Sequence, residues 1–74
     1  MTLTKAIMCV LMACDEPLTS YEVFEILPDI GRAIYPSQVR YTLMVLSKRG
    51  KIERISVNEK HGRNWVKSRY CLKE

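Results

Sequence analysis

The sequence predicts a mixed α+β fold in which helices come first and an antiparallel hairpin comes last. Three observations lead to this prediction. Apolar residues recur at helical spacing in segments 3–14 and 37–48, Gly50 directly follows the second segment, and apolar and polar residues alternate along 66–72. A chain of 74 residues is the size of one small domain, so residues 1–74 are expected to form a single unit.

The first predicted helix begins at Thr2 or Thr4, either of which can cap it, and ends near Cys14. Residues at core spacing on this helix are Leu3, Ile7, Val10, Leu11 and Cys14. The other faces are also apolar, and a helix that is apolar all round must be covered on both sides. One interpretation is a homodimer joined through Leu3, Met8, Leu11 and Met12. The other is a helix buried in its own domain, with a methionine or two exposed.

A second helix is predicted from Thr19, because Thr19-Ser20-Tyr21-Glu22 matches a capping box. Val23, Ile26 and Leu27 would point inward, and Pro28 would end the helix. The preceding Leu18 is expected to pair briefly as a short strand. Residues 29–35, which include Gly31, form a connection longer than a tight helix-turn-helix turn.

The third predicted helix starts at Pro36, which suits a first helical turn, and runs to Arg49, where Gly50 ends it. Its predicted core face consists of Val39, Thr42, Leu43 and Leu46. The opposite face carries Ser37, Arg40, Tyr41, Met44 and Lys48. That second face combines cations with an aromatic ring and a thioether, which a merely solvated surface does not require.

Two strands are expected to follow, at 51–57 and 66–72, joined by a polar, basic tip at 58–64 with Gly62 for the turn. In the second strand, alternation places Val66, Ser68, Tyr70 and Leu72 on one side. The other side receives Trp65, Lys67, Arg69 and Cys71.

Charge is divided unevenly between the two parts of the chain. Residues 1–31 contain one base and five acids, a net charge of −4, whereas residues 32–74 contain eleven bases and three acids, a net charge of +8. So basic a segment favours a polyanionic partner, although a solubilising surface is the simpler alternative.

The predicted order is helix, short strand, helix, helix, strand, basic loop and strand, and this order resembles that of the winged-helix domain. The likeness is carried by three segments: "PLTSYEVFEIL" (17–27), "LSKRGKIERI" (46–55) and "SRYCLKE" (68–74). The resemblance covers essentially the whole chain. It implies a transcription regulator that places its third helix, residues 36–49, in the major groove of DNA. The hairpin tip, or wing, would contact the backbone or the minor groove.

The chemistry of the residues agrees with the resemblance. The Arg40 guanidinium can bond the O6 and N7 atoms of guanine, and Gln38 can make a similar paired contact with adenine. Ser37 lies in the first turn of the helix, where free backbone amides favour a phosphate. The basic side chains near the other end of the helix would bind the DNA backbone. The full predicted DNA-binding set is Ser37, Gln38, Arg40, Tyr41, Met44, Lys48, Arg49, Lys60, His61 and Arg63.

Each assignment has an alternative. Arg40 could pair with Glu53 or Glu59 on the surface, and Tyr41 could lie against the domain. Trp65 could shield the hairpin base or stack on an unpaired nucleobase. Met44 and the neighbouring Val45 favour a different function, in which this helix face binds a protein partner through soft apolar contact.

An enzyme is not expected, because the one histidine lies in the hairpin tip and no phosphate-binding glycine loop is present. Cys9, Cys14 and Cys71 fit no zinc spacing, so no metal or cofactor is predicted, and thiols of this kind are typical of the cytoplasm. The longest apolar run, 6–14, is too short to span a membrane. The small size suits a viral or phage regulator.

Overall fold

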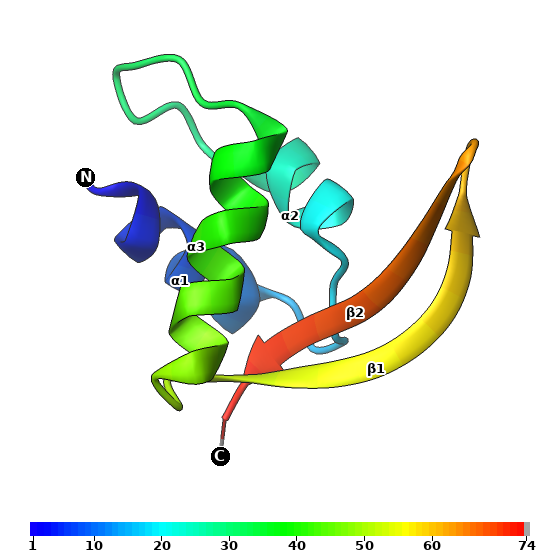
Figure 1. Cartoon of the computed structure of the whole chain (residues 1–74). Coiled ribbons are helices and arrows are strands. Elements are labelled where there is room, and N and C mark those ends of the chain that lie inside the picture. The colour runs from blue at the N-terminus through cyan, green and yellow to red at the C-terminus, as the bar shows by residue number, and fades with distance from the viewer. Residues whose placement is uncertain (74) are drawn as a thin grey trace.

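The computed structural model describes residues 1–73. In chain order its elements are α1 (Leu3–Ala13), α2 (Ser20–Ile26), α3 (Pro36–Lys48), β1 (Ile52–His61) and β2 (Asn64–Leu72). The helices pack together, and the β1–β2 hairpin leaves the end of α3 and curves away from them (Figure 1). The fold is therefore mixed α+β, as predicted, and its layout of three helices and an antiparallel hairpin is compatible with the winged helix.

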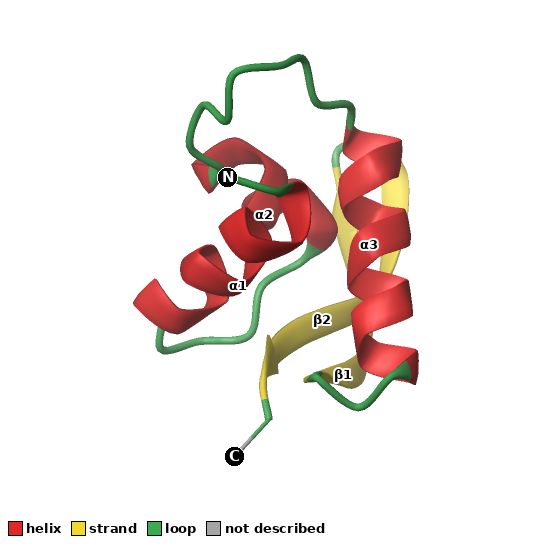
Figure 2. Ribbon diagram, turned by 90° about the vertical axis from the view of Figure 1, so that its left-hand side faces the viewer, coloured by secondary structure: helices red, strands yellow, loops and turns green. Residues whose placement is uncertain are grey.

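The core lies where the three helices meet the start of the hairpin. Ile7 of α1, Val23 of α2, and Val39 and Leu43 of α3 have no accessible surface, and Ile52 at the start of β1 is almost as deeply buried. Figure 2 shows α1 and α2 on one side and α3 on the other, with the hairpin below and behind. Apolar residues at helical spacing thus form the core that the periodicity predicts.

Helix α1 begins after Thr2, whose hydroxyl accepts a hydrogen bond from the amide of Lys5. Two of the four residues predicted for a dimer interface, Leu3 and Leu11, are instead buried in the domain's own core. Met8 is half-buried against that core, and Met12 is 70% exposed. Only the two methionines therefore remain for contact with a second copy.

Helix α2 has the predicted capping box. The amide of Glu22 donates to the Thr19 hydroxyl at 3.2 Å, and the amide of Thr19 donates to Oε1 of Glu22 at 2.9 Å. Val23 is buried and Leu27 is half-buried, but the prediction for Ile26 is wrong, since this residue is 49% exposed. Ile26 is the last residue of α2, and no further turn follows to cover it.

The end of α3 is stopped by a Schellman motif. Gly50 takes a φ of +74°, so that its amide donates to Ser47 and the amide of Lys51 donates to the carbonyl of Leu46 at 3.0 Å. This glycine turns the chain from α3 directly into β1. The prediction of its left-handed conformation is confirmed.

The hairpin is longer than predicted. Residues 58–61 and Asn64 are predicted to belong to a polar tip, but they lie in β1 and β2, and only Gly62 and Arg63 form the turn. Gly62 has a φ of +61°, which suits the first position of a two-residue hairpin loop. Between Ser56 and Glu59 the register shifts. Two residues of β1 there oppose one of β2, a bulge that strengthens the local twist.

Leu18 adds a short edge to the sheet beside β2. Its amide donates to the carbonyl of Tyr70 at 2.9 Å, and the amide of Tyr70 donates back at 2.8 Å. This bridge confirms the predicted short strand. It also fixes the segment before α2 next to the last residues of β2, which brings this segment close to Arg69.

Candidate nucleic-acid interface

The outer face of α3 is open, as the helical spacing predicts. Val39, Leu43 and Leu46 point into the core, while the exposed residues of the helix include Ser37, Arg40, Tyr41, Met44 and Lys48. Tyr41 is 64% exposed, so the alternative that its ring lies against the domain is wrong. Arg49 follows directly as the C-terminal cap of the helix and is exposed too.

Gln38 differs from its neighbours because its side chain is already engaged. Its Oε1 accepts a hydrogen bond from the amide of Tyr35 at 2.8 Å, which caps the start of α3. A paired contact with adenine uses both the oxygen and the nitrogen of the side-chain amide. Gln38 would have to release Tyr35 to make that contact.

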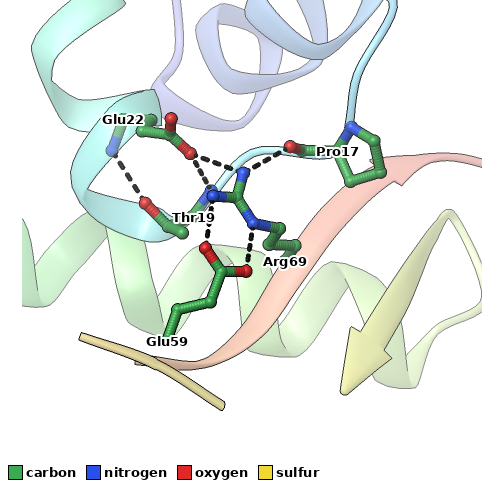
Figure 3. A network of polar contacts seen from close by, with 5 residues as sticks. All are labelled: Pro17, Thr19, Glu22, Glu59 and Arg69. Atoms are coloured by element: carbon green, nitrogen blue, oxygen red, sulfur yellow. Dashed lines mark hydrogen bonds and ion pairs between the residues drawn. The ribbon is translucent and has the colours of Figure 1, made fainter. Parts of the chain in front are cut away.

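Arg69 of β2 is the centre of a polar network that the sequence did not reveal (Figure 3). Its Nε and Nη2 donate to the two carboxylate oxygens of Glu59 at 2.6 and 2.7 Å. Its Nη1 donates to Oε1 of Glu22 and to the carbonyl of Pro17, both at 2.9 Å. The strand alternation predicted only which side of the hairpin Arg69 occupies, and in the structure Arg69 binds two acids of its own chain.

This network connects the hairpin to α2. Glu59 belongs to β1, whereas Glu22 belongs to the capping box of α2, and Arg69 holds both carboxylates. The paired hydrogen bonds from Arg69 lower the pKa of Glu59 from its usual value, and the same bonds raise the pKa of Arg69. The hairpin is thereby held beside the helices by charge as well as by its root in the core.

The far end of the hairpin also contacts α2. The imidazole ring of His61 stacks on the ring of Tyr21, with centroids 4.5 Å apart and an angle of 8° between the planes. One face of the histidine is therefore covered. Lys60 and Arg63, the other two predicted hairpin residues, are exposed.

Most of the basic side chains among residues 1–73 form no ion pair with an acid of that part of the chain. Among residues 1–73, Arg69 forms the only ion pairs, so the alternative that Arg40 pairs with Glu53 or Glu59 is wrong. The exposed bases of the second part of the chain are Arg32, Arg40, Lys48, Arg49, Lys51, Arg54, Lys60, Arg63, Lys67 and Lys73.

A groove brings the third helix and the hairpin together. We call it the α2–β2 groove; its walls include Ser20 and Tyr21 of α2, Arg40 of α3, and Trp65 and Lys67 of β2. A smaller neighbouring pocket shares Ser20, Tyr21 and Arg40 with this groove and also includes Pro36 and Ser37 at the start of α3. Arg40 and the hairpin thus border one surface. Tyr21, Trp65 and Lys67 were not in the predicted site, because only the folded hairpin places them beside Arg40.

Two further features bear on the choice of chemistry. Within residues 1–73, no three side chains of histidine, cysteine, aspartate or glutamate are grouped so that they could hold a metal ion. In the same part of the chain, every helix is too short or too polar to cross a membrane.

Neither protein-family models nor curated proteins match this chain. What the structure itself defines is a class: a small α+β domain with three packed helices and an antiparallel hairpin attached to the end of the third. Its open cationic surface lies on that helix and on the hairpin.

Proposed function

We propose that this chain is a winged-helix domain that binds double-stranded DNA and regulates transcription by occupying an operator. Helix α3 and its cap, residues 36–49, enter the major groove, and the hairpin region 58–65 lies on the backbone or in the minor groove. The protein works without a cofactor, as a cytoplasmic binding module and not as an enzyme.

The observation that carries the proposal is the α2–β2 groove together with the arginine and lysine side chains around it that form no ion pair. Arg40 of α3 and Lys67 of β2 border the same groove, and neither forms an ion pair among residues 1–73. A duplex presents two rows of phosphates on either side of a groove, so it can meet a helix and a hairpin that share one surface. Arg69 supports this arrangement by holding the hairpin against α2.

Individual roles follow from position along α3. Arg40 lies in the first half of the helix, where it reads guanine, and Met44 one turn later can contact a thymine methyl group. Tyr41 donates its hydroxyl to a phosphate. Lys48 and Arg49 at the far end hold the backbone and carry no sequence information.

The test is duplex binding as a function of salt. Affinity should fall steeply as salt rises, because each neutralised phosphate releases counterions. Arg40→Ala should cost about 1–3 kcal/mol on the preferred site and should blur the preference there. Lys5→Ala, on α1 in the acidic part of the chain, is the matched control and should leave binding unchanged. A salt-independent affinity would overturn the proposal.

A second candidate function is protein binding through the same helix. Tyr41 and Met44 are both exposed and lie three residues apart on one face, where they form an apolar pair ringed by charge. A complex of this kind should survive high salt and should be lost with Met44→Glu. Ile26→Glu, at the exposed end of α2 and outside this helix face, controls for a general effect of the added charge.

The proposed regulator acts as a homodimer joined through α1, and the exposed Met12 and half-buried Met8 are the residues available for that contact. Sedimentation equilibrium should give the dimer mass for the unchanged chain and the monomer mass for Met12→Glu. A monomer at tens of micromolar for the unchanged chain would exclude this interface.

A further inference from the structure

The α2–β2 groove offers more than a path for a phosphate backbone, because an exposed aromatic ring lies on its wall. We propose that it is a binding site for an unpaired nucleotide of single-stranded nucleic acid, with the base stacked on Trp65 and the adjoining phosphates held by Arg40 and Lys67. This site does not depend on the duplex-binding function, since a single strand can occupy it alone.

Trp65 supplies the stacking surface. It is 58% exposed although it is the largest side chain of the hairpin, and it borders the groove near the start of β2. Leaving so large an apolar ring in water forgoes the stabilisation that burial would give, and an unpaired base is a flat partner that can cover it. The opposite wall contains Tyr21, whose stack with His61 ties α2 to the hairpin end and keeps the groove in shape.

Charge favours a nucleic acid over a neutral ligand. Arg40 approaches from α3 and Lys67 from β2, and both are exposed and without an ion pair among residues 1–73. Glu22 and Glu59 both pair with Arg69, and these three side chains together keep a net charge of −1. Arg40 and Lys67 border the groove itself and their charge of +2 exceeds this residual negative charge, so the groove still attracts a phosphate.

Size favours a single base. The groove encloses about 180 Å³, less than the roughly 300–1,000 Å³ typical of small-molecule sites. One flat ring system fits such a space, while the rest of a strand runs outside it. A base inside a duplex has both faces covered by its neighbours and cannot stack on Trp65, so the aromatic wall selects unpaired nucleotides. The hydroxyls of Ser20 and Ser68 are available to the polar edge of the base.

The chain itself provides the probe, because Trp65 is its only tryptophan. Titration with a short oligodeoxythymidylate should quench the intrinsic fluorescence in a saturable manner. The same titration with oligouridylate shows whether the site accepts RNA as well as DNA. A blunt duplex at the same phosphate concentration should quench the fluorescence less, because its bases are already stacked on one another and cannot cover the Trp65 ring.

Variants separate stacking from charge. With a labelled oligodeoxythymidylate followed by anisotropy, Trp65→Ala should weaken binding about tenfold, whereas Trp65→Phe should retain most of it. Lys67→Ala should weaken binding and reduce its dependence on salt. Lys60→Ala is the matched control, since Lys60 pairs with Trp65 across the hairpin but does not border the groove, and its effect should be smaller. Thermal unfolding of each variant verifies that the fold is kept.

Three results would overturn the site: no saturable quenching by either single strand, equal quenching by the blunt duplex, or unchanged affinity for Trp65→Ala. The duplex-binding proposal is judged separately, by the salt-dependent affinity of the duplex. Duplex binding without quenching by single strands would retain that proposal and reject this one. Quenching by single strands without duplex affinity would retain the single-strand site and reject the duplex-binding proposal.

Discussion

The helical core and the outer half of the hairpin are held in place by different forces. In the core, Ile7, Val23, Val39 and Leu43 have no accessible surface, so burial of apolar area holds the helices together. Along residues 57–67 of the hairpin, only Val66 is buried, and the contacts with α2 are the carboxylates around Arg69 and the stack of His61 on Tyr21. Apolar burial does not titrate, whereas ion pairs respond to pH and salt.

This difference has a consequence for the proposed function. The part of the molecule that positions α3 does not depend on ion pairs, whereas the part that positions the hairpin does and should respond to salt and to acid. Substitutions in the core should therefore change global stability. Substitutions around Arg69 should change the hairpin alone. They should thereby change the position of the basic side chains of the hairpin relative to Arg40.

The largest effect is expected for Leu43→Ala, which removes a fully buried side chain from the centre of α3. The loss of apolar burial and the cavity left behind should lower the free energy of unfolding by about 2–5 kcal/mol. Urea unfolding followed by circular dichroism measures it.

Met44→Ala is the matched control, since Met44 is the next residue on the same helix but faces outward. Its effect should stay within about 0.5 kcal/mol. Equal losses for the two variants would contradict the assignment of an inner and an outer face to α3.

A smaller effect is expected for Thr19→Ala at the start of α2. The Thr19 hydroxyl accepts a hydrogen bond from the amide of Glu22 in an otherwise buried position. Its removal should cost about 1 kcal/mol, the usual value for a helix cap, and Thr19→Ser should restore most of it. Urea unfolding of the unchanged chain, Thr19→Ala and Thr19→Ser measures these differences. If Thr19→Ser were as unstable as Thr19→Ala, packing of the threonine methyl group would matter more than the hydrogen bond of the cap.

The core was predictable because its signals are local. Helical spacing identified Val39, Leu43 and Leu46, the spacing of Thr19 and Glu22 identified the cap, and Gly50 identified the end of α3. Each of these features involves residues within one or two helical turns of each other, so the pattern is visible before the chain folds.

The outer hairpin was not predictable in the same way. Asn58–His61 lacks the apolar alternation of a strand because both of its faces meet solvent or polar groups, yet backbone pairing with Asn64–Val66 makes it one. Arg69 binds partners that are 47 and 52 residues away in the chain, at Glu22 and Pro17. No spacing rule connects such residues, so the alternation along 66–72 could place Arg69 on one side of the strand but could not indicate its partners.

Arg69→Gln is expected to act on the hairpin with little effect on the core. It breaks the bonds to Glu59 and Glu22, both of which are partly exposed, so global stability should change less than in Thr19→Ala. Amide hydrogen exchange should become several-fold faster in the outer halves of β1 and β2 and stay constant in α1 and α3. Lys67→Gln, two residues away and without an ion pair among residues 1–73, is the control. If exchange also became faster throughout α1, Arg69 would stabilise the helical core as well as the hairpin, and the two regions would not be held by different forces.

The smallest expected effect is a response of the hairpin to acid. The hydrogen bonds from Arg69 hold the pKa of Glu59 below its usual value of 4.5. A carboxylate whose pKa is lowered by folding stabilises the folded state fully above its unfolded pKa, and this contribution disappears as the pH falls through the lowered folded value. Protection of the outer hairpin amides should therefore be constant above about pH 4.5 and decrease below it. In Glu59→Gln this acid dependence should be absent, because the side chain no longer titrates. If the hairpin of Glu59→Gln loosened with acid as much as the unchanged chain, another group would have to hold it, and the Arg69 network would not be what separates the hairpin from the core.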